Sequence, residues 1–314
     1  MDSETFVKGA AAATLERARG SSTSTSASAL RSRVGDYLEL TKPRITGLVM
    51  VTAAAGFYLG SSGAFDVVLF AHTIFGVALV AAGTSAMNQV IERDVDALMK
   101  RTRNRPLPSG RIRTMPAAVF SGVLAAVGIL YLAVFTNLLT AALAFATFAS
   151  YDFMYTPLKR VHSFSTVVGA LPGALPALGG WTAATGALGG GGWALFAILF
   201  LWQLPHFLTL SWILRDDYEA AGIRMLSVGD QNAFRTRHQT LVYTLALLPV
   251  TLLPTMIGIA GPIYFLSALA LGLVFLWRSV SFARTADAGM ARKVFKYSVI
   301  YLPLLLLALT VDKV

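Results

Sequence analysis

Long apolar segments recur along the whole chain, and they limit its fold more than any other feature. A helix needs about 20 consecutive apolar residues to cross the hydrocarbon of a bilayer. The sequence contains nine such candidates, at 43–62, 67–87, 116–135, 138–155, 164–185, 193–213, 240–259, 262–279 and 295–312. Only 13% of the residues are charged, whereas soluble domains carry roughly 25%. We therefore predict an all-α polytopic membrane protein with nine transmembrane helices.

The positions of the basic residues predict the orientation of these helices. Of the 26 Lys and Arg residues, 25 lie in the segments 1–44, 93–113, 159–160, 215–237 and 278–296. Only Lys313 falls on the opposite side. Because loops rich in Lys and Arg remain cytoplasmic, we expect the N-terminus inside and the C-terminus outside. The net charge of +10 arises from these loops, so we expect the lipid bilayer and no nucleic acid as a partner.

The first 35 residues differ in composition from the rest of the chain. Residues 1–35 are rich in Ala, Ser, Thr and Arg without a long apolar run, which is typical of a disordered tail. We predict a disordered cytoplasmic tail over 1–35 and one transmembrane domain over 36–314. Residues 189–192 are four glycines and predict a flexible outer turn. The absence of Cys excludes disulfides, thiolate metal ligands and a catalytic thiol.

A cluster of oxygen-bearing side chains follows the second apolar run. Asn88, Glu92 and Asp96 are spaced four residues apart, so on a helix they share one face. Mg²⁺ prefers carboxylate and carbonyl oxygens, with substrate phosphates completing its coordination. A solvated helix end would show the same residues, but ionisable groups at a membrane edge are usually functional. The spacing favours a catalytic magnesium site.

A basic loop comes directly after this cluster. Arg101, Arg103 and Arg105 lie in a short stretch that ends in a Pro-rich turn. Guanidinium groups match the geometry of phosphate oxygens. An ordinary membrane anchor would use the same residues, but a neighbouring metal site favours a diphosphate, whose charge metal and cations would neutralise together.

The fourth span ends in a second polar group. Asp152 lies about one turn inside the expected membrane edge, where a lone carboxylate needs a partner. Tyr155 and Lys159 follow it, four residues apart. We predict that Asp152 and Tyr155 are catalytic and that Lys159 binds diphosphate, although Lys159 is equally consistent with a membrane anchor.

The sixth span carries Trp202, Gln203 and His206 and is followed by Asp216 and Asp217. A histidine inside a membrane helix serves either as an interhelical hydrogen-bonding group or as a contact to a substrate or haem. The two aspartates either supply ligands for a second metal ion or cap a loop. Because all these groups fall on the cytoplasmic side, we expect one cytoplasm-facing polar cavity below an apolar space suited to an isoprenoid chain.

Several of these motifs resemble the UbiA superfamily of intramembrane prenyltransferases. Residues 88–107 are similar to its signature over twenty consecutive positions, and 40–44, 155–160, 202–207 and 217–226 add shorter matches. The resemblance covers residues 36–312 and implies a UbiA-like bundle of nine helices. It also implies that Lys42, within the first short match, binds diphosphate.

The segment Trp202-Gln203-Leu204-Pro205-His206 is similar to the branch of this superfamily that acts on haem. That resemblance implies farnesyl diphosphate and haem B as substrates, haem O as product and Mg²⁺ as cofactor, with Trp202, Gln203 and His206 at the haem. It further implies a bacterial inner membrane and a downstream haem A synthase as a partner. Ser165 departs from the Asn expected there. A quinone precursor or chlorophyllide is the alternative acceptor, and a transporter is a more distant alternative.

Overall fold

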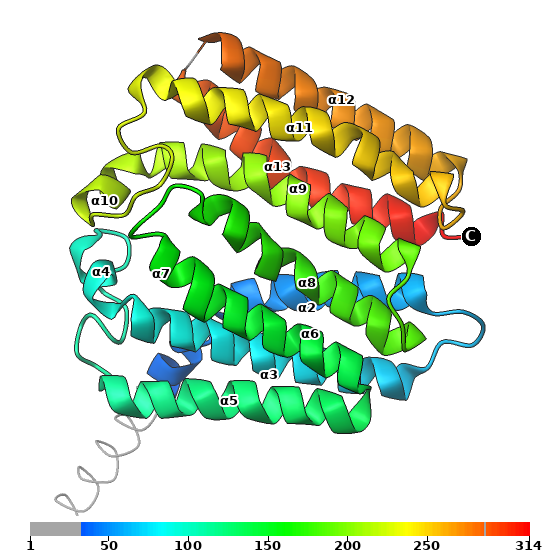
Figure 1. Cartoon of the computed structure of the whole chain (residues 1–314), viewed down its shortest axis with the longest axis horizontal. Coiled ribbons are helices and arrows are strands. Elements are labelled where there is room, and N and C mark those ends of the chain that lie inside the picture. Colours follow the sequence, from blue (N-terminus) through cyan, green and yellow to red (C-terminus); the bar gives the residue numbers. More distant parts are fainter. Residues whose placement is uncertain (1–32, 286) are drawn as a thin grey trace, which may run out of the picture.

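The computed structural model describes residues 33–285 and 287–314, and nearly all of them are helical. This confirms the all-α prediction, since the described residues contain only one isolated β-bridge, Ala260 to Lys313. The predicted tail lies almost wholly outside the described residues. Long helices run between the two ends of one bundle (Figure 1). They are α2 Pro43–Gly60, α3 Val67–Ile91, α5 Thr114–Phe135, α6 Leu138–Ala149, α8 Ser165–Thr185, α9 Gly190–Ile213, α11 Phe234–Met256, α12 Pro262–Thr285 and α13 Ala288–Val311.

The short elements collect at one end of the bundle. Those labelled α4, α7 and α10 lie together there, opposite the C-terminus (Figure 1). The short elements are α4 Arg93–Leu98, the π-helix η1 Ser150–Tyr155, α7 Thr156–Leu158, α10 Arg215–Ala220 and the 3₁₀-helix η2 Gln231–Ala233. The polar loops that the sequence predicts on one side of the membrane are thus brought to one end of the molecule.

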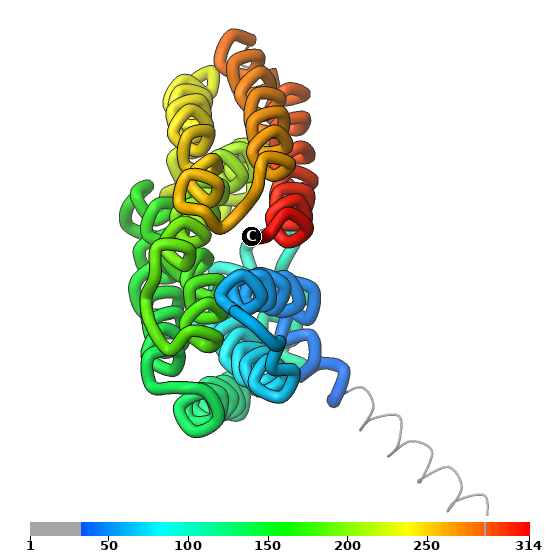
Figure 2. Tube along the Cα trace, turned by 90° about the vertical axis from the view of Figure 1, so that its right-hand side faces the viewer, coloured from blue at the N-terminus to red at the C-terminus, as the bar shows by residue number. Residues whose placement is uncertain are grey.

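The helices form two groups joined through α8 and α9. Helices α2, α3, α5, α6 and α8 lie on one side and α9, α11, α12 and α13 on the other (Figure 2), and α8 packs against both α2 and α9. Small residues allow α2 and α8 to approach closely. A Cβ on Gly180 would lie 1.9 Å from the carbonyl oxygen of Ala53, and one on Gly56 would lie 2.0 Å from that of Ala177. Close contact through small residues is typical of membrane helix pairs.

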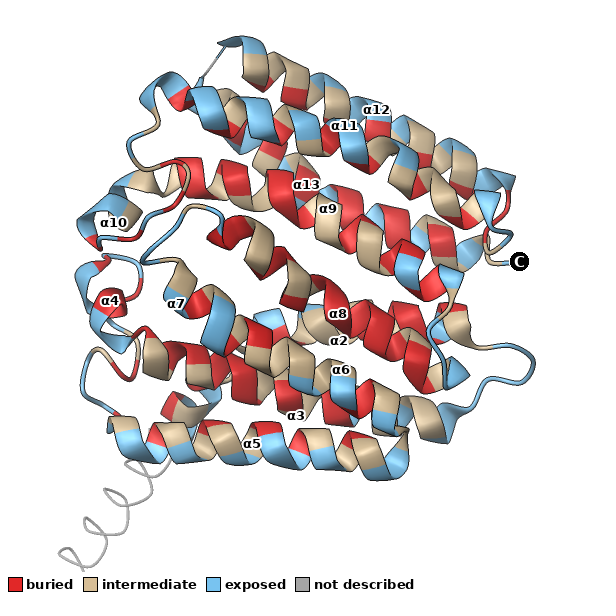
Figure 3. Ribbon diagram, in the orientation of Figure 1, coloured by how far each residue is buried: buried red, intermediate tan, exposed pale blue. Residues whose placement is uncertain are grey.

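The outer faces of the bundle are apolar. Buried, intermediate and exposed residues alternate along α5 and α12, whereas α8 is mostly buried (Figure 3). The exposed side chains include Leu130 on α5 and Trp277 on α12, which are 65% and 63% exposed. In water such a surface would associate, so these faces fit contact with lipid.

Eight of the predicted spans coincide with helices that are long and apolar enough to cross a membrane. The protein is therefore a multi-pass membrane protein. Helix α2 is not among the eight. It has 18 residues and begins with Pro43 and Arg44, so the ninth span and the N-in, C-out orientation remain predictions.

Reporter fusions test this topology. We expect fusions after residues 63, 137, 189 and 261 to read as external, and fusions after residues 105, 161, 225 and 288 to read as cytoplasmic, because the basic residues lie in the second set of segments. Alkaline phosphatase and fluorescent-protein fusions at each site provide the two readouts. One reversed site would contradict the nine-span arrangement.

Candidate active site

Asn88, in the last turn of α3, connects three segments at the polar end of the bundle. The Oδ1 of Asn88 accepts a hydrogen bond from Nζ of Lys42 at 2.8 Å. Its Nδ2 donates to Oε2 of Glu92 at 3.0 Å and to Oγ1 of Thr156 at 3.1 Å. Asn88 is only 2% exposed. It thus joins the start of α2, the end of α3 and α7 in one buried hydrogen-bond network.

Glu92 and Lys159 form a buried ion pair within this network. The Oε1 of Glu92 lies 2.5 Å from Nζ of Lys159, and the two side chains are 11% and 12% exposed. The same ammonium lies 4.5 Å from the ring centroid of Tyr155. The sequence predicts opposite roles for Glu92 and Lys159, as a metal ligand and a diphosphate ligand, and the structure brings the two into direct contact.

Asp96 forms a second ion pair one turn further along. Its Oδ2 lies 2.7 Å from Nη1 of Arg105, and the carboxylate is 1% exposed. The helix that we expected to run unbroken through 88–96 is interrupted, because α3 ends at Ile91 and α4 begins at Arg93. Backbone bonds from Glu92 N to Asn88 O and from Asp96 N to Glu92 O preserve the helical spacing across the break.

The electrostatics of this cluster favour an incoming anion. Burial, followed by the charge of Arg105, lowers the pKa of Lys42 to about 8. Burial alone would raise the pKa of Glu92, but Lys159 and Lys42 hold it below its usual value. Burial would lower the pKa of Lys159, but Tyr155 and Glu92 raise it above its usual value. A polyanion would stabilise the protonated form of all the basic groups here.

Asp152 and Tyr155 lie in the π-helix η1, which the sequence did not predict. Asp152 is fully buried, and neither carboxylate oxygen has a hydrogen-bond partner among the described residues. The ring of Tyr155 packs on α8 at Gly169, where an added Cβ would lie 2.6 Å from Cε2 of the ring. A π-helical turn inside an α-helix frequently marks a functional site.

The contact between Tyr155 and Gly169 gives a direct test of the Tyr155 position. We expect Gly169→Ala to displace the ring and to lower turnover about tenfold, because a misplacement of about 1 Å near reacting groups can cost that much or more. The matched control is Gly179→Ala in the same helix, where a Cβ would meet nothing within 4 Å. Equal activity of the two variants in purified form would show that the position of Tyr155 is unimportant.

The loop after α10 packs against α4 and so belongs to the same end of the site. Buried side chains of the two segments form one cluster, namely Val95, Met99, Ala221, Ile223 and Met225. The backbone N–H of Arg224 also donates to the carbonyl of Lys159 at 2.8 Å. Tyr218 of α10 is part of this contact, and burial raises its pKa, with a further contribution from Tyr155.

The structure does not join Asp216 and Asp217 to the cluster around Glu92. The Asp216 side chain is 87% exposed and lies 3.4 Å from Arg215. Within the described ranges, no three His, Asp or Glu side chains are grouped to hold a metal ion. The predicted second metal site therefore remains a prediction. A site built on Asn88, Glu92 and Asp96 would need substrate oxygens to complete its coordination.

His206 lies apart from these groups, on the side of α9 that faces α13. Its Nδ1 is 2.8 Å from Oγ of Ser298, and Nε1 of Trp202 donates to the carbonyl of Ser298 at 2.8 Å. The His206 ring stacks on Trp202 at 5.1 Å and lies 4.8 Å from Phe295. Gln203 instead donates to the carbonyl of Leu199 at 3.1 Å. The structure thus supports the hydrogen-bonding role of His206 and leaves its contact to haem as a prediction.

Only part of the predicted basic set reaches the cluster. Lys42, Arg105 and Lys159 contact Asn88, Asp96 and Glu92, whereas Arg101 and Arg103 are exposed. Sequence reasoning missed Thr156, whose hydroxyl accepts from Asn88 and donates to the carbonyl of Tyr151 at 2.8 Å. The position of Thr156 four residues after Asp152 in the sequence could have indicated that it belongs to the site.

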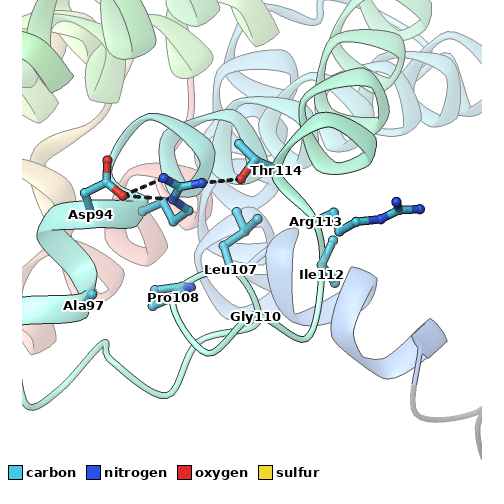
Figure 4. Close-up of a pocket in the computed structure, with 9 residues that line it drawn as sticks. Asp94, Ala97, Leu107, Pro108, Gly110, Ile112, Arg113 and Thr114 are labelled. Carbon is cyan, nitrogen blue, oxygen red and sulfur yellow. Dashed lines mark hydrogen bonds and ion pairs between the residues drawn. The ribbon is translucent and has the colours of Figure 1, made fainter.

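A separate cavity of about 510 Å³ lies between α4, the basic loop and the start of α5. Asp94 and Thr114 lie among the residues that line it (Figure 4), and so does Arg93. Arg93 donates to Oδ1 of Asp94 at 2.8 Å and to Oγ1 of Thr114 at 2.7 Å. This contact ties the short helix α4, which carries Asp96, to the beginning of α5.

An all-helical membrane bundle with buried acids and bases at one end is the framework of a membrane-embedded enzyme that handles an anionic substrate. A model of the UbiA prenyltransferase family matches residues 49–301, so the chain belongs to that family.

Two of its relatives within the family are named protoheme IX farnesyltransferase. The one from Solibacter usitatus is 44% identical over 287 residues, covering 88% of this chain and 98% of the relative. The one from Salinibacter ruber is 45% identical over 277 residues, covering 88% and 98%.

Solved structures confirm the fold. A digeranylgeranylglyceryl phosphate synthase structure superposes with a TM-score of 0.77 at 19% identity, covering 89% of this chain and 98% of that one. A UbiA homologue from Archaeoglobus fulgidus, bound to GPP and Mg²⁺, has a TM-score of 0.64 at 16% identity, covering 87% and 99%. At these identities the likeness supports the all-helical UbiA arrangement and no more.

Proposed function

We propose that this protein transfers the farnesyl group of farnesyl diphosphate to a vinyl group of haem B, with addition of water, to give haem O and diphosphate. The observation that carries the proposal is the buried network of Asn88, Glu92 and Lys159 at the polar end of a membrane bundle. The sequence of the chain is 40–45% identical to those of several protoheme IX farnesyltransferases, which supports haem B as the acceptor.

The basic residues of the cluster are suited to hold the diphosphate. Lys42, Arg105 and Lys159 each form a bond to an amide or carboxylate oxygen of the cluster, and each could exchange that contact for a diphosphate oxygen. Charge-assisted hydrogen bonds of this kind are about twice as strong as neutral ones. The exposed Arg101 and Arg103 would attract the diphosphate from the aqueous side.

The acidic side of the cluster fits Mg²⁺. Asn88, Glu92 and Asp96 offer hard oxygen donors at one-turn spacing, and the exchange of their cationic partners to the diphosphate would free those oxygens. When bound there, Mg²⁺ would help neutralise the charge that develops on the leaving diphosphate. A solved UbiA homologue from Archaeoglobus fulgidus has GPP and Mg²⁺ bound, which supports Mg²⁺ dependence of the reaction but assigns no ligand in this chain.

The acceptor would lie toward α9 and α13. Nδ1 of His206 is held by Ser298, so Nε2 is the ring nitrogen that remains for haem iron or a propionate. Trp202 and Phe295 place aromatic surface around the imidazole. Holding the porphyrin in one orientation would bring a vinyl carbon to the allylic carbon, an effect that lowers barriers substantially.

His206 variants test this placement. We expect His206→Ala to lower haem O formation at least tenfold and to change the absorption spectrum of bound haem, if the imidazole orients the porphyrin. A purely structural imidazole would cost only about 0.6 kcal/mol of stability, the average for interhelical hydrogen bonds. Ser298→Ala is the matched control, because it removes the Nδ1 contact and leaves the imidazole. An unchanged spectrum and normal turnover in His206→Ala would reassign the residue to packing.

We place the protein in the bacterial cell inner membrane, since the relatives named above are bacterial. Its product would then pass to a haem A synthase for the cofactor of a haem-copper oxidase. Pull-down of the two proteins from detergent-solubilised membranes tests the partnership.

Diphosphate release provides the test of the proposed reaction. The purified protein in lipid nanodiscs should release diphosphate only when farnesyl diphosphate, haem B and Mg²⁺ are all present, and EDTA should stop the release. Omission of each component is the control. Release that is independent of haem B, or unaffected by EDTA, would contradict the proposal.

A further inference from the structure

Asp152 is the one fully buried carboxylate in the described ranges for which no hydrogen-bond partner is found at either oxygen. Burial of a carboxylate without a partner is strongly unfavourable, and such a group in a native structure calls for an explanation. The residue lies in η1, the π-helix between α6 and α7. If Asp152 had a purely structural role, a neighbouring helix would donate a hydrogen bond to its carboxylate. No such donor is found among the described residues.

The position of Asp152 follows from its helix. Thr156 lies four residues later and contacts Asn88 at 3.1 Å, so Asp152 lies about one helical turn deeper in the bundle than that contact. On α3, Thr84 lies one turn before Asn88, and its buried Oγ1 also lacks a partner in the described structure. Two unpartnered polar groups therefore occupy the same depth, just beyond the diphosphate cluster.

The proposed reaction consumes one water molecule. When the diphosphate leaves with the electron pair of its C–O bond, the vinyl π electrons form the new C–C bond to the farnesyl carbon. Positive charge then remains on the carbon attached to the porphyrin ring. A lone pair of water forms the C–O bond of the hydroxyl, and an O–H bond of that water must break. The active-site cavity must otherwise be dry, since free water would hydrolyse the first cation.

We propose that Asp152, with the Thr84 hydroxyl at the same depth, holds the water molecule that ends the reaction, and that the Asp152 carboxylate accepts its proton. The proton then leaves with the diphosphate, so atoms and charge balance. A carboxylate and a hydroxyl supply the polar partners that a buried water needs. The assignment rests on the proposed farnesyl transfer and adds the residue that decides how the final cation is quenched.

Asp152→Asn tests the assignment through the identity of the product. The variant should still release diphosphate, because the cluster around Glu92 is unchanged. Its final cation should instead lose a proton from the adjacent carbon and give a farnesylated porphyrin lighter than haem O by one water. We expect the ratio of haem O to this product, measured by mass spectrometry, to fall about 100-fold, the typical contribution of a proton acceptor. Asp152→Glu should restore most of the haem O.

Ser150→Ala is the control for disturbance of η1, because the buried Ser150 hydroxyl donates only within its own helix, to the carbonyls of Ala146 and Thr147. It should leave the product ratio unchanged. Thr84→Val provides a second test if Asp152→Asn does not fold, and should shift the ratio in the same direction. Haem O as the sole porphyrin product of a folded Asp152→Asn, or loss of diphosphate release together with product, would overturn the proposal. So would an unchanged ratio in Thr84→Val. A wild-type protein that makes no haem O would instead refute the farnesyl transfer itself.

Discussion

Replacing Glu92 with Gln should lower turnover by about two to three orders of magnitude, the range observed when one group that stabilises developing charge is removed. Glu92 combines two roles in our account, since its carboxylate would be a ligand of Mg²⁺ and also pairs with Lys159 at 2.5 Å. Asp96→Asn should show a similar loss, because Asp96 is 1% exposed and pairs with Arg105. The measurement is kcat of purified variants with saturating farnesyl diphosphate and haem B.

Asp94→Asn is the matched control for these variants. Asp94 lies between Glu92 and Asp96 in sequence, but its side chain is 77% exposed and pairs with Arg93 at the surface. We expect it to retain nearly normal turnover. If Glu92→Gln, Asp96→Asn and Asp94→Asn all retained normal turnover, the proposed metal site would be wrong.

Loss of stability could imitate loss of catalysis in Glu92→Gln. Removal of one partner leaves the buried ammonium of Lys159 without its countercharge, which costs about 3–5 kcal/mol for buried pairs. The double variant Glu92→Gln/Lys159→Met removes both charges and should recover most of that stability without recovering turnover. Thermal unfolding of the wild type, Glu92→Gln, Lys159→Met and the double variant in nanodiscs separates the two effects.

Lys159→Met should reduce kcat/KM for farnesyl diphosphate by about 10- to 100-fold, the equivalent of one hydrogen bond to a charged group. The KM for haem B should change little, because Lys159 lies in the cluster with Glu92 and Tyr155 and His206 lies elsewhere. Arg160→Met is the matched control, since the adjacent Arg160 is exposed and donates to the carbonyl of Ile91. An effect on haem B alone would reassign Lys159 to the propionates.

The sequence predicted the architecture well because burial in lipid imposes long apolar runs and places basic residues on one side. Eight spans coincide with membrane-length helices, and the polar segments meet at one end (Figure 1). The chemical types in the cluster were also predictable, since Asn88, Glu92 and Asp96 follow a helical spacing that survives the break at Glu92.

The pairings inside the cluster could not be predicted. Glu92 and Lys159 lie just beyond the ends of helices that are far apart in the sequence, and their contact depends on how η1 packs against α3 and on the Asn88–Thr156 bond. The π-helix itself has no local sequence signal, so the unpartnered state of Asp152 was visible only in the structure.

The four glycines at 189–192 show the same limit. The sequence predicted a flexible turn over these four residues. That prediction was wrong for three of them, because α9 begins at Gly190. A Cβ on Gly191 would lie 2.3 Å from the ring of Trp181. The glycines therefore allow close packing of α9 on Trp181, which a single sequence does not distinguish from flexibility.

The most direct test of the central claim is the identity of the acceptor. Purified protein in nanodiscs is incubated with Mg²⁺, farnesyl diphosphate and equal concentrations of haem B and a hydroxybenzoate quinone precursor, and the products are identified by mass spectrometry. Our account predicts haem O as the prenylated product and unmodified hydroxybenzoate. Farnesylated hydroxybenzoate with unchanged haem B would contradict it.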